Sequence, residues 1–161
     1  MIQKYIIIAL LCSNCVSVQV NSDDDTNLSV ESITMIEGKL IYKGNPEYIP
    51  RMIKNSPSSN EIINYDYTIS YEPTDPSDFA VVLNPLLTFG FPIEKHKVIL
   101  NGTLKYNNGN ESISSKVIVS QYRTLYNNPN YSEMRRLGLF KLKTNIETKY
   151  QNNLICDEKN R

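Results

Sequence analysis

His96 is the only histidine in the 161-residue chain, so it is the side chain best suited to act as a general base near neutral pH. Glu94, Lys95 and Lys97 flank it. Charged neighbours on both sides are typical of a surface position, and we therefore interpret His96 as solvent-facing rather than catalytic. The sequence contains no Gly-x-Ser-x-Gly elbow, phosphate-binding loop or glycine-rich dinucleotide turn. These observations favour a protein that is not an enzyme and needs no cofactor.

Acidic and thiol side chains do not form a recognisable metal site. Asp23, Asp24 and Asp25 are adjacent carboxylates in a polar stretch, and such a run does not preorganise a calcium site. The three cysteines, Cys12, Cys15 and Cys156, do not have the spacing of zinc ligands. We expect no metal.

The first residues have the pattern of a secretory signal sequence. Lys4 supplies a positive charge, and an apolar run over residues 5–12 follows. This run is much shorter than the stretch of about 20 residues that a transmembrane helix needs. Small residues come next, and cleavage after Ser17 would place Cys15 at the −3 position. We expect residues 1–17 to be removed and the remaining chain to be exported.

Cys15 allows a second interpretation of the first residues, as the signal sequence of a lipoprotein. Bacterial lipoproteins are cut directly before a cysteine that then carries the lipid, and the sequence around Cys15 resembles such a lipobox loosely, because Asn14 is an unusual residue at the position before it. The polar segment 16–28 would then tether the domain to a membrane. Simple secretion and lipid attachment at Cys15 both remain open. In either case Cys156 has no partner for an internal disulfide in the mature domain.

Alternating tyrosines are the first candidates for partner binding. Tyr65, Tyr67 and Tyr71 occupy alternate positions of a strand-like segment and therefore share one face. Packing in the core is the interpretation we favour. The alternative is an exposed aromatic strip, a surface that binds proteins or sugars by stacking.

Basic residues in the second half are the other candidates. The net charge is zero, but residues 1–80 carry five basic and eleven acidic side chains, and residues 81–161 carry twelve basic and six acidic ones. A basic patch that includes Arg123, Arg135 and Arg136 would suit an acidic partner. In the alternative interpretation, folding mixes the basic and acidic side chains over the surface, and the uneven charge along the sequence has no function. Nucleic acid is not an expected partner of an exported chain with a pI near 6.6.

Four Asn-x-Ser/Thr triplets are candidate glycosylation sites. They begin at Asn27, Asn101, Asn110 and Asn130. Asn101 lies inside a predicted strand, which is a poor place for a glycan. We keep Asn27, Asn110 and Asn130 as candidates, although a chain so rich in asparagine contains such triplets by chance.

Runs with a two-residue period predict a β-rich domain. The clearest supersecondary signal is a hairpin with strands at 97–106 and 112–122, because Asn-Gly in the turn 107–110 tolerates the positive φ of tight connections. The other predicted strands cover residues 33–42, 65–71, 79–83 and 139–146.

One short helix is predicted over residues 129–137. Asn128 can cap it, Pro129 suits its first position, and Gly138 can end it. The domain organisation then reads as a signal sequence (1–17), a polar acidic linker (18–32), a single β-rich domain (33–150) and a flexible tail (151–161).

Together these elements predict an antiparallel β-sandwich. An immunoglobulin-like arrangement is one version, although tryptophan and a cysteine pair are lacking. For function we expect an exported, non-enzymatic module that binds an extracellular or envelope protein or glycan. The alternative is a lipid-anchored component of a bacterial envelope with a structural or assembly role.

Overall fold

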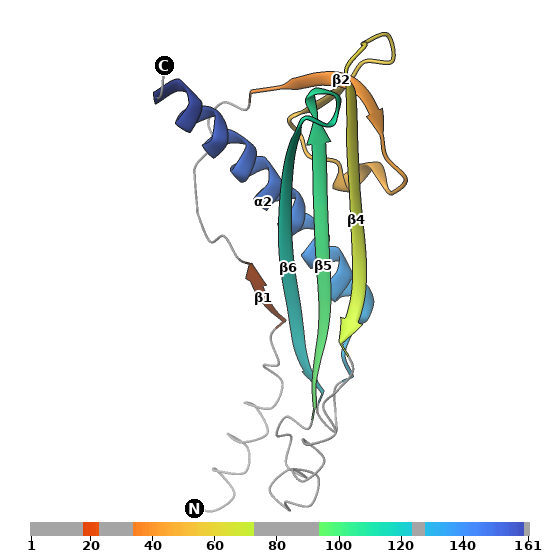
Figure 1. Ribbon diagram of the computed structural model, residues 1–161. Helices are drawn as coiled ribbons and strands as arrows, with labels where there is room; N and C mark the ends of the chain where they lie inside the picture. The colour runs from red at the N-terminus through yellow and green to blue at the C-terminus, as the bar shows by residue number, and fades with distance from the viewer. Residues whose placement is uncertain (1–17, 23–33, 73–93, 124–127, 160–161) are drawn as a thin grey trace, which may run out of the picture.

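The described part of the chain folds into one mixed β-sheet with one long helix across one of its faces (Figure 1). The structure is a computed structural model that describes residues 18–22, 34–72, 94–123 and 128–159. The described elements follow the order β1 (Gln19–Ser22), β2 (Ile36–Ile41), η1 (Pro46–Tyr48), β3 (Ile53–Asn55), β4 (Ile62–Glu72), β5 (Glu94–Tyr106), η4 (Asn107–Gly109), β6 (Glu111–Arg123) and α2 (Tyr131–Lys159).

The β5–β6 hairpin forms the centre of the sheet and confirms the clearest sequence signal. Its register runs without interruption from Glu94 opposite Arg123 to Tyr106 opposite Glu111. The turn contains two asparagines with positive φ, and Gly109 follows at φ 87°. Asparagine and glycine accept this left-handed backbone more readily than other residues.

The strand order is β1-β6-β5-β4-β2-β3. Strands β1, β6, β5 and β4 pair antiparallel, whereas β2 pairs in parallel with both β4 and β3. The expectation of a mainly β protein with one helix is confirmed. The predicted antiparallel β-sandwich is not confirmed, because the sheet is mixed and curled. Within the described residues, α2 covers the face of the sheet on which a sandwich would place its second sheet.

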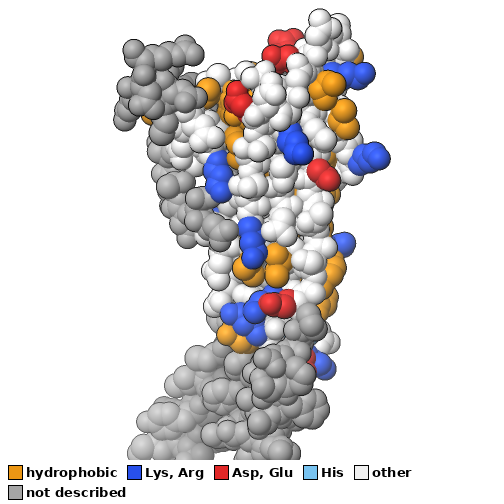
Figure 2. Space-filling model, in the orientation of Figure 1, with side chains coloured by type: hydrophobic (Ala, Val, Ile, Leu, Met, Phe, Trp, Pro, Cys, Tyr) orange, Lys and Arg blue, Asp and Glu red, His pale blue; other side chains and the backbone are white. Residues whose placement is uncertain are grey.

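The core lies between this sheet face and α2. One row of buried residues along α2 recurs every four positions, which is the spacing of one helix face: Met134, Gly138, Leu142, Ile146 and Tyr150. The sheet contributes alternate residues of the three central strands, among them Ile63 and Tyr65, Val98, Leu100 and Leu104, and Val117 and Val119. The opposite alternation places polar side chains such as Asp66, Thr68 and Ser70 at the surface. In the view of Figure 2, charged side chains of both signs are scattered over a largely polar surface.

Helix α2 corrects three sequence predictions. The helix does not end at Gly138 after residues 129–137, and it includes both the predicted strand 139–146 and nearly all of the predicted tail 151–161. Gly138 is an interior position where helix and sheet approach closely: an added Cβ would lie 3.0 Å from Val119 Cγ2. The glycine therefore serves packing rather than termination.

The start of α2 also differs from the prediction. The predicted cap, Asn128, lies two residues too early, because Asn130 caps the helix: its Oδ1 accepts a hydrogen bond from the Glu133 N–H at 3.1 Å.

The predicted linker also contains regular structure. Gln19–Ser22, which we placed in the linker 18–32, forms β1 and pairs with residues 117–120 of β6. The segment between β2 and β4 includes η1 and β3. Residues 1–17, the linker from residue 23 onward and the predicted strand 79–83 lie outside the described residues. Within the described ranges, no helix is long and apolar enough to cross a membrane.

Candidate functional site

Five side chains meet where β5 begins and β6 ends. They are Tyr71 from β4, Glu94 and His96 from β5, Arg123 from β6 and Tyr131 from α2, and we call them the sheet-end surface. The strand register explains their meeting, because Glu94 pairs with Arg123 and Tyr71 pairs with Val98. The start of α2 then adds Tyr131.

His96 lies between a carboxylate and a phenol. Its Nε2 is 3.2 Å from Glu94 Oε2, and its Nδ1 is 2.6 Å from the Tyr131 hydroxyl oxygen. An ionised carboxylate only accepts hydrogen bonds, so in the neutral ring Nε2 carries the proton and Nδ1 accepts the Tyr131 O–H. The side chain of His96 is only 16% exposed, and the prediction of a solvent-facing histidine is therefore wrong.

Arg123 brings a positive charge to the same carboxylate. Its Nη1 is 3.4 Å from Glu94 Oε2, the oxygen that also lies next to His96. About half of the Arg123 side chain remains exposed. A guanidinium carries five N–H donors in a fixed fork, so Arg123 can hold Glu94 and still contact a molecule from solvent.

Two exposed tyrosines complete the surface. Tyr71 is 51% and Tyr131 40% exposed, and their rings meet edge to face with centroids 5.6 Å apart. The Tyr131 ring also packs edge-on to the imidazole of His96, with centroids 5.8 Å apart. Such pairs hold the rings in place, so an incoming partner would meet an aromatic surface that is already ordered.

The other two predicted tyrosines belong to the core side of β4. Tyr65 is only 1% exposed, so the favoured interpretation of core packing is confirmed for it and the alternative of a partner contact at Tyr65 is wrong. It stacks on Tyr42 with centroids 5.3 Å apart, and Tyr67 is half-buried beside both. Burial raises the pKa of both Tyr65 and Tyr42. The hydroxyl of Tyr65 has no hydrogen-bond partner among the described residues.

Arg135 and Arg136 lie exposed on α2, but the structure gives Arg136 different neighbours from Arg123. Its guanidinium donates to Glu133 at 3.0 and 2.7 Å and lies 5.9 Å from the ring of Phe140. This pairing raises the pKa of Arg136 and lowers that of Glu133. Arg123 and Arg136 thus each pair with a different carboxylate.

Two glycosylation candidates are described and both are exposed. Asn110 follows η4 in the hairpin turn. Asn130 caps α2 with its side-chain oxygen. Asn27, like the predicted lipid acceptor Cys15, lies outside the described residues.

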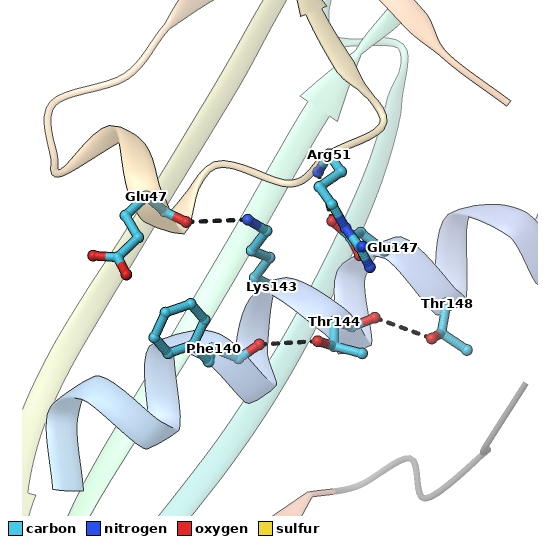
Figure 3. A network of polar contacts seen from close by, with 7 residues as sticks. All are labelled: Glu47, Arg51, Phe140, Lys143, Thr144, Glu147 and Thr148. Atoms are coloured by element: carbon cyan, nitrogen blue, oxygen red, sulfur yellow. Dashed lines mark hydrogen bonds and ion pairs between the residues drawn. The ribbon is translucent and has the colours of Figure 1, made fainter. Parts of the chain in front are cut away.

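A second polar network joins the segment after β2 to α2 (Figure 3). The buried carboxylate of Glu147 accepts two hydrogen bonds from Arg51, one from its backbone N–H at 2.5 Å and one from its guanidinium at 3.2 Å. Lys143 Nζ donates to the carbonyl of Glu47 at 3.0 Å. These bonds satisfy backbone groups of an irregular segment, which is a structural task.

No group of three or more His, Cys, Asp or Glu side chains in the described part of the chain is placed to hold a metal ion. Sequence reasoning did not single out Glu94 and Tyr131. The spacing of Glu94 and His96 contains a signal, because residues two apart in a strand point to the same face. Tyr131 follows His96 by 35 residues, and only the tertiary fold brings the two together.

Comparisons with known proteins yield no match to any family model, curated protein or solved structure. The functional reasoning therefore rests on the chemistry of the sheet-end surface. Its tyrosines and Arg123 can contact a partner, and its imidazole can accept a proton from Tyr131.

Proposed function

We propose that the chain is an exported, non-enzymatic module that binds an extracellular or envelope protein or glycan through the sheet-end surface. The observation that carries this proposal is the exposed edge-to-face pair of Tyr71 and Tyr131 beside Arg123. Tyrosine and arginine are enriched among the residues that dominate binding energy in interfaces. Tyrosine rings also stack on sugars, which keeps a glycan among the candidates.

The order of this surface supports a binding role. Tyr131 is held by His96, and Arg123 is held by Glu94, so both side chains have lost part of their rotamer freedom before a partner arrives. Preorganised side chains lower the entropic cost of association. Export is supported by the sequence pattern of residues 1–17.

A photo-cross-linking residue placed at position 71 tests the proposal. The variant protein is returned to the medium or cell surface to which the chain is exported, and is then irradiated. We expect one discrete covalent adduct, and we expect Arg123→Ala in the same protein to reduce it. The matched control places the same residue at Thr68, which is exposed on the other face of β4. Equal adducts from positions 71 and 68, or none from position 71, would contradict the proposal.

Lipid attachment at Cys15 is the second candidate function, and β1 changes its geometry. Because Gln19 already pairs with Ser120, only residues 16–18 separate Cys15 from the sheet. Four extended residues span at most about 14 Å. The polar segment 16–28 therefore does not act as a long tether, and an anchored domain would hold the β1 end of the sheet near the lipid headgroups.

Detergent partitioning distinguishes this alternative from simple secretion. A lipid-anchored protein enters the detergent phase of a phase-separating detergent, and Cys15→Ala moves it to the aqueous phase. A wild-type chain that stays in the aqueous phase would rule out the anchor and leave the binding proposal unaffected.

A further inference from the structure

We propose that Tyr131 is an activated phenol that accepts an acyl group from an activated ester, with His96 as the base and Glu94 as a positioning residue. This acceptor site goes beyond the proposed binding function, because it assigns a covalent chemistry to one side chain. It requires one acyl transfer per chain and no turnover.

Three side chains stand in the order of nucleophile, base and orienting carboxylate. The Tyr131 hydroxyl is 2.6 Å from His96 Nδ1, and His96 Nε2 is 3.2 Å from Glu94 Oε2. This arrangement is the general signature of an activated nucleophile: a hydroxyl within reach of a base that a third group orients. Glu94 contacts His96 and Arg123, and it acts on Tyr131 only through His96.

The proton and electron pairs balance in a simple acyl transfer. As the Tyr131 oxygen attacks the ester carbonyl, its proton passes to His96 Nδ1 and gives an imidazolium that Glu94 stabilises. The carbonyl–oxygen bond to the leaving group then breaks, and the leaving oxygen takes the proton back from His96. The products are acyl-Tyr131 and an alcohol, with His96 neutral again.

The surroundings leave the site accessible and favour the charge that develops there. Tyr131 is 40% exposed, so an ester can reach its oxygen. Among the described residues, the titratable or charged groups of this surface around His96 are Glu94 on β5, Arg123 on β6, Tyr71 on β4 and Tyr131 on α2. Glu94 stabilises the forming imidazolium, whereas the positive charge of Arg123 lies next to the same carboxylate and opposes the imidazolium in part.

Tyr71 is a built-in control for this reactivity. It is slightly more exposed than Tyr131 and lies against it, but its hydroxyl has no imidazole partner among the described residues. An unassisted phenol reacts mainly as phenolate and gains reactivity as it loses its proton, whereas a histidine base assists a protonated phenol once the imidazole itself is neutral.

The experiment treats the mature protein with p-nitrophenyl acetate and follows acetylation of both tyrosines by peptide mass spectrometry. General-base assistance is typically worth about a hundredfold or more, so we expect Tyr131 to be acetylated about a hundredfold faster than Tyr71. The Tyr131 rate should rise with pH and then level off once the assisting base is fully deprotonated. Equal rates for Tyr131 and Tyr71, a Tyr131 rate that follows the same pH dependence as the Tyr71 rate, or an acetyl group that stays on His96 would each overturn the proposal.

Two variants separate the base from the positioning residue. His96→Gln should lower the Tyr131 rate to that of Tyr71 and give both tyrosines the same pH dependence. Glu94→Gln should reduce the Tyr131 rate but keep a pH dependence that differs from that of Tyr71, because His96 remains as the base. The Tyr71 rate in each variant reports unfolding, which would raise both rates together. An unchanged Tyr131 rate in His96→Gln would overturn the proposal even where every variant folds.

Discussion

Gly138 of α2 lies directly against Val119 of β6, so closely that a Cβ on the glycine would be 3.0 Å from Val119 Cγ2. Gly102 of β5 lies equally close to the next turn of the helix, because a Cβ added to it would be 2.9 Å from Leu142 Cδ2. These two glycines let α2 approach the sheet closely, and the start of the helix with Tyr131 belongs to the same packed unit as His96.

Gly138→Ala should therefore destabilise the fold. Alanine favours a helix by about 1 kcal/mol over glycine, but overpacking a well-packed core typically costs about 1–3 kcal/mol. We expect a net decrease in the free energy of unfolding, measured by urea denaturation. The matched control is Thr144→Ala, at an exposed position of the same helix, which should leave stability within about 0.5 kcal/mol of wild type. A Gly138→Ala protein that is more stable than wild type would show that helix and sheet are not in tight contact.

Glu147→Ala should be more damaging than Arg51→Ala. Glu147 is nearly buried and accepts two hydrogen bonds, and its loss leaves the Arg51 N–H without a partner. Hydrogen bonds to charged groups contribute about 1.5–3 kcal/mol. Arg51→Ala keeps the backbone bond and removes only an ion pair whose basic partner is exposed, which is worth about 0–1 kcal/mol. Urea unfolding of both variants should show this order, and the reverse order would contradict the assignment.

Tyr65→Phe should be neutral or stabilising. The hydroxyl of Tyr65 is buried without a partner among the described residues, and an unsatisfied buried polar group typically costs about 1–3 kcal/mol. Phenylalanine keeps the ring that stacks on Tyr42 and removes the oxygen. A thermal melt should show an unchanged or higher midpoint. Tyr42→Phe is the matched control, because it removes a hydroxyl that does form a hydrogen bond: the Tyr42 O–H donates to the Asn45 carbonyl at 3.0 Å. A large loss of stability in Tyr65→Phe would mean that its hydroxyl is satisfied.

Stability should fall at alkaline pH. Burial raises the pKa of Tyr42, Tyr65 and Tyr150 above the ordinary value of 10.0. The unfolded chain then loses these protons at lower pH than the folded chain does, so the stabilisation is complete below a pH of about 10 and declines as the pH rises from there toward the folded pKa. Urea midpoints measured between a pH of about 8 and 11 should decrease, and tyrosinate absorbance should appear together with loss of the circular dichroism signal. Midpoints that stay constant over this range would contradict the predicted coupling.

Local patterns predicted the parts of the fold that depend on neighbours in sequence. The Asn-Gly pair at the turn and the alternation of apolar and polar residues on both sides of it were sufficient to predict the β5–β6 hairpin. The alternating tyrosines were sufficient to predict β4. The length of helix α2 was missed, because a glycine is a frequent helix terminator and the predicted helix therefore ended before Gly138. At Gly138 the close approach of Leu100 and Val119 outweighs that local preference, and nothing near it in the sequence reveals those neighbours.

The candidate site was predicted only in pieces for the same reason. Tyr71 and Arg123 were recognised as surface candidates, and His96 as the only histidine. Their meeting depends on strand register and on the start of a helix that the sequence placed differently. Tyr65 shares its face with Tyr71, yet α2 and Tyr42 bury one end of that face and leave the other end exposed.

The N-terminus of the mature protein tests export most directly. Intact mass and N-terminal sequencing of the protein recovered outside the cytoplasm should give a chain that begins at Val18, one residue before β1. A chain that begins at a lipid-modified Cys15 would favour the anchored alternative. A chain that retains Met1 and residues 1–17 would contradict a cleaved, exported module.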